Sequence, residues 1–323
     1  MVDPATPAFA LGRLSDGTRE FTALVRYERV LDLDTVADEI GLPVPVSVTD
    51  LLQDWTRVLP ILENLSMTAD LADHVVLAPV QPRQVFQSGA NYRTHVIDLA
   101  MAHMEITEGK TVDEVRAEVA AMMDERAASG IPYVFLGLPS SIGGPFDDVT
   151  LPAYSDRHDW ELELAAVIGV PAFRVGRGEA LEHVAGYTIV NDLTTRDRVF
   201  RRDMKEIGTD WFRGKNAPGF LPTGPWLVPA AAVADPMDLR ITLTLNGEVR
   251  QDESTKDMLF DVAALISEIS QTTTLLPGDL VLTGSPAGNG QPTGRFLRDG
   301  DVMVGTITGL GSQVIRCVAE ARR

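Results

Sequence analysis

The sequence predicts a mixed fold in which short strands are many and helices are few. Beyond about residue 80, the chain consists mostly of short apolar runs separated by Gly and Pro, which is typical of strands and turns. One longer passage, TVDEVRAEVAAMMDERAASG, has apolar residues at helical spacing. The first 80 residues contain a hairpin pattern and a helical pattern. We therefore expect a small N-terminal domain over residues 1–80 and a larger domain over residues 81–323.

Turn and helix signals define the N-terminal elements. In FALGRLSDGTREFTALVRY, the turn Ser15-Asp16-Gly17 lies between two strand-like runs and predicts a hairpin. SVTDLLQDWTRVLPILENL predicts a helix from Ser47 that is broken or kinked near Pro60, because proline cannot donate a backbone hydrogen bond. Two prolines then precede a strand-like run in APVQPRQVF, residues 78–86, which sets the domain boundary near residue 80.

Two further signals define elements of the larger domain. The helical passage starts with a capping box at Thr111 and Glu114, and it stops at Gly130, shortly before Pro132. Later in the chain, Asn246-Gly247 separates two alternating segments and predicts a tight hairpin.

Composition excludes several classes of function. The 323 residues include 46 acidic and 28 basic side chains, a formal net charge of −18, which repels phosphate backbones and anionic lipid surfaces. We therefore expect no nucleic acid and no membrane as partner. The sequence has neither a secretory pattern at its start nor a stretch long enough for a membrane helix, so we expect a cytoplasmic protein. The single cysteine, Cys317, rules out an internal disulfide and a cysteine-based zinc site, and its strand-like surroundings predict a small buried hydrophobe.

Two acids interrupt the apolar run HDWELELAAVIG. Because side chains alternate along a strand, Glu161 and Glu163 share one face, which turns apolar at Ala165 and Val167. If protein covers both faces, two carboxylates on residues roughly 6.6 Å apart would repel each other unless something positive lay between them. A divalent cation would neutralise them. A half-exposed strand with its acids in water explains this segment, taken alone, equally well.

A third acid follows a second strand-like run. GYTIVNDLTTRDR places Thr188, Val190 and Asp192 on one face, with Asp192 near the end of the run. Three carboxylates without cysteine form an all-oxygen donor set, which suits Mg²⁺ or Mn²⁺, with Ca²⁺ as a further candidate. Zinc is disfavoured by the same donors.

Eight motifs in chain order resemble those of the fumarylacetoacetate hydrolase family, between about Phe86 and Val318. They are GANYRTH, FLGLPSS, HDWELELAAVIG, GYTIVNDLTTRD, WFRGKN, LNGEVRQ, LLPGDLVLTGSPAGNG and LRDGDVMVGTITGLG. The resemblance implies that Glu161, Glu163 and Asp192 hold the metal. It also implies an α+β fold in which layered, strongly curved mixed β-sheets form a roll around the metal, beside a small N-terminal α/β domain, and a homodimer.

The resemblance also implies roles for residues around the metal. His95 would activate water, and Asp98 would orient the imidazole of His95. The two residues are three positions apart, so they would share a face if this segment is a helix. Lys215, in WFRGKN, would stabilise charge on the reacting carbonyl. The implied substrate-binding residues are Tyr92, Arg196 and Ser285. Without the resemblance, these positions are more typical of surface ion pairs, a solvated lysine and a turn serine.

Three positions depart from the family pattern. Asp98 stands where the family commonly has glutamate, Leu138 replaces a common lysine, and Val199 replaces a common glutamine. The two lost polar groups predict a substrate that is less polar at one end than a compact dicarboxylate. The segment 101–130 is longer than the corresponding loop in small members of the family. We expect it to include a lid, with an ordinary packed helix as the alternative.

These features predict a divalent-metal-dependent hydrolase that cleaves a C–C bond in a 1,3-dicarbonyl substrate, such as an acylpyruvate or a fumarylacetoacetate-like compound. The partner would be a small 2-oxo acid or diketone. The main alternative is an isomerase, hydratase or decarboxylase of a 2-oxo acid on the same metal site. A catalytically silent protein stabilised by its metal is less favoured.

Overall fold

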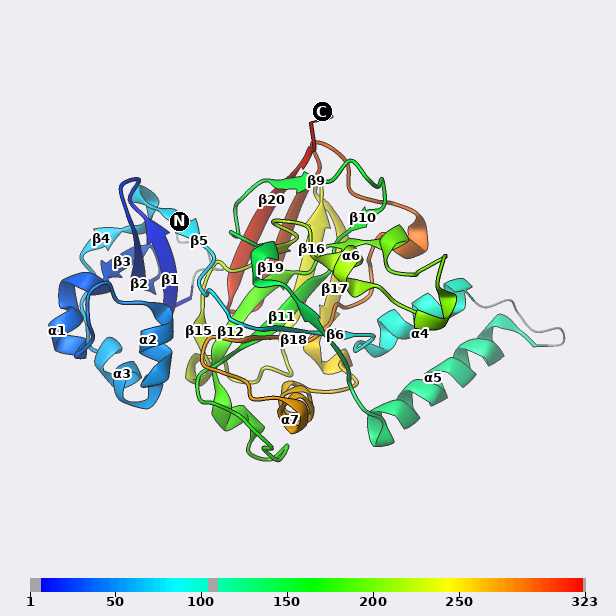
Figure 1. The fold of residues 1–323 in the computed structure, drawn as a ribbon, viewed down its shortest axis with the longest axis horizontal. Helices are drawn as coiled ribbons and strands as arrows, with labels where there is room; N and C mark the ends of the chain where they lie inside the picture. The colour runs from blue at the N-terminus through cyan, green and yellow to red at the C-terminus, as the bar shows by residue number, and fades with distance from the viewer. Residues whose placement is uncertain (1–6, 104–109, 322–323) are drawn as a thin grey trace.

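A computed structural model of the chain describes residues 7–103 and 110–321 (Figure 1). The fold belongs to the α+β class, with larger β-sheets in the body of the molecule and helices around them. Residues 104–109, inside the segment 101–130 predicted to include a lid, lie outside the described residues. None of the described helices combines the length and apolar character needed to cross a bilayer.

The first sheet and three short helices form an N-terminal unit, on the left in Figure 1. The strand order is β4-β3-β2-β1-β5. Its elements are β1 (Ala10–Ser15), β2 (Glu20–Arg26), β3 (Arg29–Asp32), α1 (Ala37–Ile40), α2 (Val48–Gln53), α3 (Trp55–Leu62), β4 (Ala69–Asp70) and β5 (Val75–Leu77). The predicted hairpin is confirmed, because Ser15 pairs with Glu20 across the turn. The helix break expected near Pro60 occurs instead at Asp54, whose φ of −131° separates α2 from α3. Pro60 lies inside α3, where it removes only one intrahelical hydrogen bond.

The second sheet contains the strand with the two glutamates. Its six strands have the order β15-β12-β11-β18-β6-β7, and all neighbours are antiparallel except β18 and β6. The strands are β6 (Val85–Gly89), β7 (Tyr133–Gly137), β11 (Leu162–Ile168), β12 (Val184–Asn191), β15 (Val228–Pro229) and β18 (Leu280–Leu282).

The third sheet has the order β17-β16-β19-β20-β9. Its strands are β9 (Val149–Leu151), β16 (Arg240–Leu245), β17 (Glu248–Ser254), β19 (Val302–Ile307) and β20 (Gly311–Ala319). The predicted hairpin at Asn246-Gly247 is confirmed, with positive φ angles of 53° and 84° at its two turn residues. Cys317 lies buried in β20, as expected.

Short ladders and four helices complete the fold. The ladders pair β8 (Ile142–Gly143) with β14 (Leu221–Pro222), and β10 (His158–Asp159) with β13 (Thr194–Thr195). The helices are α4 (Arg93–His103), α5 (Val112–Ser129), α6 (Trp211–Lys215) and α7 (Val262–Thr272). The predicted capping box at the start of α5 is confirmed, because the side chains of Thr111 and Glu114 each accept from the other residue's backbone N–H.

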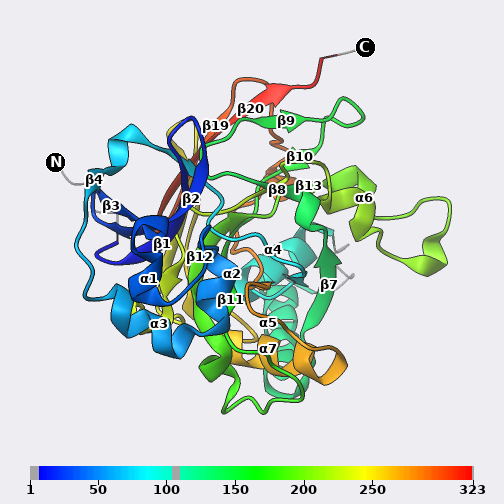
Figure 2. The same ribbon diagram turned by 60° about the vertical axis from the view of Figure 1, so that its left-hand side comes forward.

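Strand β11 is buried on both faces and separates two hydrophobic clusters. Every second residue from Leu162 to Ile168 belongs to the larger cluster, which also includes residues of α7 and the third sheet. Ala165 and Val167 belong to the smaller cluster, which they share with α1, α2 and α3. Figure 2 shows α2 in front of β11 and β12. The N-terminal unit therefore covers the apolar part of the same β11 face that carries Glu163.

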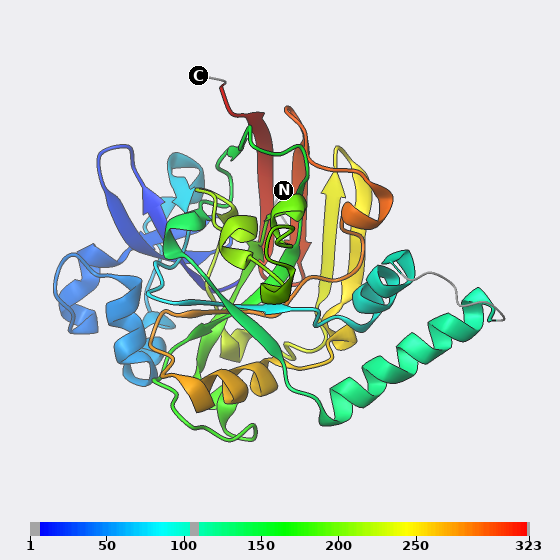
Figure 3. The same cartoon turned by 45° about the vertical axis from the view of Figure 1, so that its right-hand side comes forward.

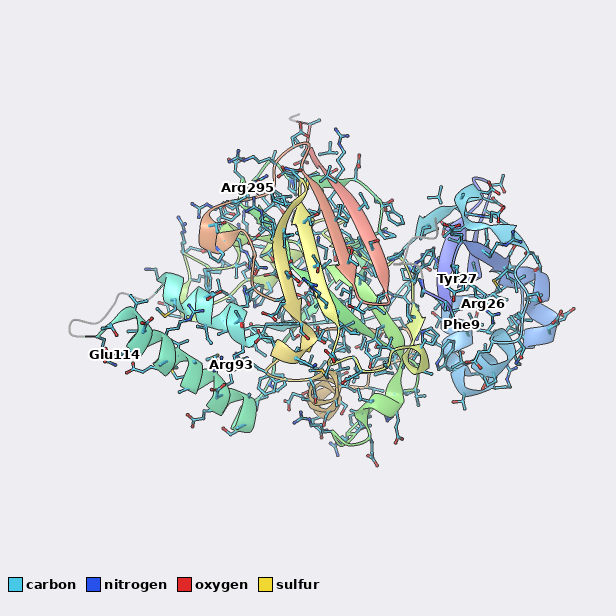
Figure 4. All side chains as sticks on the ribbon, turned by 180° about the vertical axis from the view of Figure 1, so that it is seen from behind. Phe9, Arg26, Tyr27, Arg93, Glu114 and Arg295 are labelled. Atoms are coloured by element: carbon cyan, nitrogen blue, oxygen red, sulfur yellow. The ribbon has the colours of Figure 1, made fainter. Side chains whose placement is uncertain are left out.

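Helices α4 and α5 pack side by side at the margin of the molecule (Figure 3). Two ion pairs join them: Arg93 Nε to Asp124 Oδ1 at 2.6 Å, and Arg116 Nη2 to Asp98 Oδ1 at 2.8 Å. Figure 4 labels Arg93 at the start of α4 and Glu114 near the start of α5. Exposed ion pairs contribute little to stability, but α5 also buries Val115 and Val119.

Candidate metal centre

Three carboxylates converge at one end of the β11–β12 pair. Glu161 directly precedes β11, Glu163 lies within it, and Asp192 directly follows β12. Backbone pairing brings the strand ends together, since Asp192 N donates to Glu161 O at 2.8 Å. One carboxylate oxygen from each of the three residues lies within 4.8 Å of the others. The three residues are only 8%, 2% and 2% exposed, which excludes the alternative of a half-exposed strand with its acids in water.

A buried lysine and a partly buried arginine accompany these acids. Lys215, at the end of α6, donates from Nζ to Glu161 Oε2, to Asp192 Oδ2 at 2.6 Å and to Asp192 O at 2.9 Å. Arg196 donates from Nη2 to Glu161 Oε1 at 2.7 Å. Although burial opposes the effect, Arg196 and Lys215 lower the pKa of Glu161 to about 2. Because an ammonium has three hydrogens, these contacts use every donor of Lys215 and make it a holder of the two acids in this arrangement.

The charges of Lys215 and Arg196 compensate the three acids unequally. Glu163 Oε2 accepts from the backbone N–H of Gly284 at 2.7 Å, but burial and the charge of Asp192 raise the pKa of Glu163 well above its usual range. Burial also raises the pKa of Asp192 to about 6. A divalent cation among the three carboxylates would offset this repulsion. The all-oxygen donor set fits Mg²⁺, Mn²⁺ or Ca²⁺.

His95 reaches the site from the first turn of α4. The chain before α4 is anchored by Asn91, which donates from Nδ2 to Phe260 O at 2.9 Å and to Thr283 O at 2.7 Å. Burial lowers the pKa of His95 to about 4, against the opposing charge of Glu161. The imidazole is therefore neutral near pH 7, which is the form that can accept a proton. Asp98 lies one turn further along α4 and also raises the pKa of His95, but its carboxylate accepts a hydrogen bond from Arg116.

The predicted substrate-binding residues differ in how accessible they are. Arg196 lies between two acids, with Nε on Asp159 Oδ2 at 2.7 Å and Nη2 on Glu161. Ser285 keeps 6% of its surface exposed and follows Gly284, which binds Glu163. Tyr92 is fully buried, so contact with a substrate would require movement at the start of α4. The role of Tyr92 stays a prediction.

Sequence reasoning missed two residues that hold the site together. Gln87, on β6, donates from Nε2 to Asp192 Oδ1 at 2.6 Å. Asp159 is fully buried and accepts from Gly290 N at 2.6 Å as well as from Arg196. Strand alternation offered a signal for Asp159, which stands two positions before Glu161. An amide in an apolar run gives no comparable signal for Gln87.

Two known proteins are similar to part of this chain. The 2,4-didehydro-3-deoxy-L-rhamnonate hydrolase of Sphingomonas sp. (strain SKA58) is 45% identical over 185 residues, 56% of this chain and 63% of that protein. The human mitochondrial oxaloacetate tautomerase FAHD2B is 42% identical over 182 residues, 56% of this chain and 57% of that protein. The matched segments therefore span less than two thirds of both relatives.

A solved structure and a family model match more of the chain. The crystal structure of maleylpyruvate hydrolase from Sphingobium sp. SYK-6 in complex with manganese (II) ion and pyruvate has a TM-score of 0.71 and 26% identity, covering 97% of this chain and 100% of that one. The family model described as fumarylacetoacetate (FAA) hydrolase C-terminal matches residues 84–318. This segment includes all three clustered acids, His95, Lys215 and most of the fold outside the N-terminal unit. The chain belongs to the fumarylacetoacetate hydrolase family.

Proposed function

We propose that the protein is a divalent-metal-dependent hydrolase that cleaves a C–C bond in a 1,3-dicarbonyl 2-oxo acid, such as an acylpyruvate or a fumarylacetoacetate-like compound. The observation that carries this proposal is the buried cluster of Glu161, Glu163 and Asp192, with a neutral histidine close enough to interact with it electrostatically. The hydrolase from Sphingomonas and the manganese- and pyruvate-bound maleylpyruvate hydrolase support the same class of substrate. The bound cation would be Mg²⁺ or Mn²⁺, with Ca²⁺ as a further candidate.

Each side chain has a task in the proposed reaction. Glu161, Glu163 and Asp192 would hold the cation, which when bound polarises a carbonyl oxygen and stabilises the enolate that leaves. His95 would take a proton from water for attack on the distal carbonyl. Asp98 would favour the protonated imidazole by its negative charge, and Arg196 would carry positive charge toward the substrate. Lys215 would hold Glu161 and Asp192, because all its donors are used. To contact a developing oxyanion, Lys215 would have to release one of these two acids.

The substrate would be less polar at one end. Leu138 and Val199, which replace polar residues of the family pattern, both lie against α6: Leu138 N donates to Asn216 Oδ1 at 2.6 Å, just beyond that helix, and Val199 packs on Gly214. We infer that the apolar end of the substrate faces this side of the site.

The decisive experiment is a substrate panel with each metal. Purified protein would be incubated with Mg²⁺, Mn²⁺ or Ca²⁺ and with each acylpyruvate or 2-oxo dicarboxylate. Enolate absorbance would be monitored, and product masses would be determined by mass spectrometry. Two fragments whose combined mass equals substrate plus water would support the proposal. Metal-induced thermal stabilisation without turnover of any compound would favour a catalytically silent protein.

A second candidate is tautomerisation or another rearrangement of a 2-oxo acid on the same site. The 42% identity to an oxaloacetate tautomerase favours it. The same panel distinguishes the two reactions, because tautomerisation or isomerisation leaves the mass unchanged, whereas hydration adds one water and decarboxylation removes carbon dioxide.

We expect metal loss, rather than protonation of His95, to limit activity in acid. As the pH falls, Asp192 with a pKa of about 6 gains a proton before His95 with a pKa of about 4. Protons and the cation compete for the same carboxylate. Raising the Mn²⁺ concentration should therefore move the acid limb of the kcat/KM profile to lower pH. A limb that stays in place at every Mn²⁺ concentration would contradict this assignment.

We propose that the segment 101–130, which contains α5, includes a lid over the site, although the packing of α5 on α4 also fits an ordinary structural helix. Deleting residues 106 to 128 should raise KM, because substrate would be held less well. Thermal unfolding of the shortened protein should accompany the kinetics, to show that the remaining fold is intact. Unchanged kinetics in a folded variant would discard the lid.

We propose a cytoplasmic homodimer that binds a small molecule and neither nucleic acid nor membrane. Sedimentation equilibrium at several protein concentrations tests the assembly: a single species of twice the chain mass is expected.

A further inference from the structure

Two buried amides surround the hydroxyl of Ser285, in the loop after β18. Gln251 Nε2 donates to Ser285 Oγ at 2.8 Å, and Asn289 Nδ2 donates to the same oxygen at 3.3 Å. Gln251 is fully buried and Asn289 is 2% exposed, whereas Ser285 keeps 6% of its surface exposed. The serine is thus the member of this group with the most exposed surface, while the two amides lie deeper.

The orientation of both amides is determined by other partners. Gln251 Oε1 accepts from Leu162 N at 3.1 Å, and Gln251 Nε2 also donates to Pro286 O at 2.9 Å. Asn289 Nδ2 donates to Trp160 O at 2.9 Å. A backbone N–H can only donate and a backbone carbonyl can only accept, so turning either amide over would place like groups together. Both amides therefore present N–H to the serine.

This arrangement decides what the serine can offer. A hydroxyl has two lone pairs and one hydrogen, and the two amides occupy its acceptor side. Its hydroxyl hydrogen points to Pro286 O at 3.3 Å, which is long for an O–H···O bond, and that carbonyl already accepts from Gln251. An oxygen of a bound molecule at about 2.7 Å would be a better acceptor.

We propose that Gln251 and Asn289 are positioning residues that make Ser285 an obligatory hydrogen-bond donor to an anionic oxygen of the substrate. The inference rests on the proposed function, because it assumes that a 2-oxo acid binds beside the three carboxylates. The proposal predicts that Ser285 prefers a ligand with a carboxylate or enolate oxygen at this position. A ligand that presents an N–H there would be disfavoured.

A double-mutant cycle on the full chain loaded with Mn²⁺ tests the proposal, with oxalate as an unreactive dianion measured by calorimetry. Ser285→Ala should weaken oxalate binding by about 10- to 100-fold, the range for a hydrogen bond to a charged group. Gln251→Met, which removes one amide donor at similar volume, should weaken binding by about 3- to 10-fold, the range for a hydrogen bond between neutral groups. In the Ser285→Ala background, Gln251→Met should cause no further loss.

The controls separate positioning from simple damage. Ser285→Thr keeps the hydroxyl and should restore oxalate binding, and Mn²⁺ affinity without oxalate should stay unchanged in every variant. If Gln251→Met does not fold, Asn289→Ala supplies the same cycle through the second amide. Losses that add in the double variant would overturn the proposal, because they would show that the amides act independently of the hydroxyl.

The outcomes for the wild-type protein distinguish this inference from the proposed function. Wild-type protein that binds oxalate but cleaves no acylpyruvate would remove the hydrolase assignment and leave the role of the amides supported by the cycle. Wild-type protein that holds Mn²⁺ but does not bind oxalate would overturn the inference itself.

Discussion

Replacing His95 with alanine is expected to leave metal binding intact and to lower kcat by about 10²- to 10⁴-fold, the usual contribution of a general base. The imidazole is kept neutral by burial, with a pKa of about 4, so nearly all of it can accept a proton at pH 7. It is placed by α4, whose start is tied to the rest of the domain through Asn91. Stopped-flow measurement of enolate loss, with calorimetric titration of Mn²⁺, gives the two quantities.

A matched control separates this effect from the loss of any imidazole. His183→Ala removes a histidine outside the site, where Nδ1 lies 3.2 Å from Val170 O, and it should leave kcat unchanged. Normal hydrolysis by His95→Ala would show that another group activates water. Loss of Mn²⁺ binding in His95→Ala would instead assign the histidine to the metal.

Glu163→Gln is expected to abolish metal binding and activity together. The amide keeps an acceptor for the N–H of Gly284 but removes the negative charge that the cation needs. Changes in groups that only orient metal ligands cost about 10- to 100-fold in affinity, so loss of a ligand charge should exceed about 100-fold. Mn²⁺ titration by calorimetry measures this loss.

Thermal unfolding gives a second readout of Glu163→Gln. Without metal, burial and the charge of Asp192 raise the pKa of Glu163 well above its usual range, so the fold disfavours a charge at this position and an amide of the same shape fits it. The melting temperatures of metal-free wild type and variant should therefore agree, whereas Mn²⁺ should raise only that of the wild type. The exposed Glu248 supplies the control, since Glu248→Gln should keep the full response to Mn²⁺. An equal response in Glu163→Gln would show that Glu163 is not a ligand.

The three acids were predictable because their positions follow from local periodicity. Alternation along an extended strand is enough to place Glu161 and Glu163 on one face, and the second run places Asp192 at its end. The strand fragments and two hairpins were predictable for the same reason, since turn residues such as Asn246 and Gly247 impose local backbone angles.

The partners of these acids depend on contacts between distant parts of the chain. Gln87 lies 105 residues from Asp192, and its hydrogen bond exists only because β6, β18, β11 and β12 are joined in one sheet. The ion pair that joins Asp98 to Arg116 depends on how α5 packs against α4. Sequence spacing alone therefore does not predict either contact.

The position of β11 between the two hydrophobic clusters has a consequence for how the protein melts. Ala165 and Val167 are covered by the N-terminal helices, so detaching that unit would expose to water the face of the strand that carries Glu163. Neither part can open without weakening the other, and scanning calorimetry should record one cooperative transition for the whole chain. A substitution such as Leu51→Ala in α2, distant in sequence from the acids, should therefore lower the temperature at which bound Mn²⁺ is released.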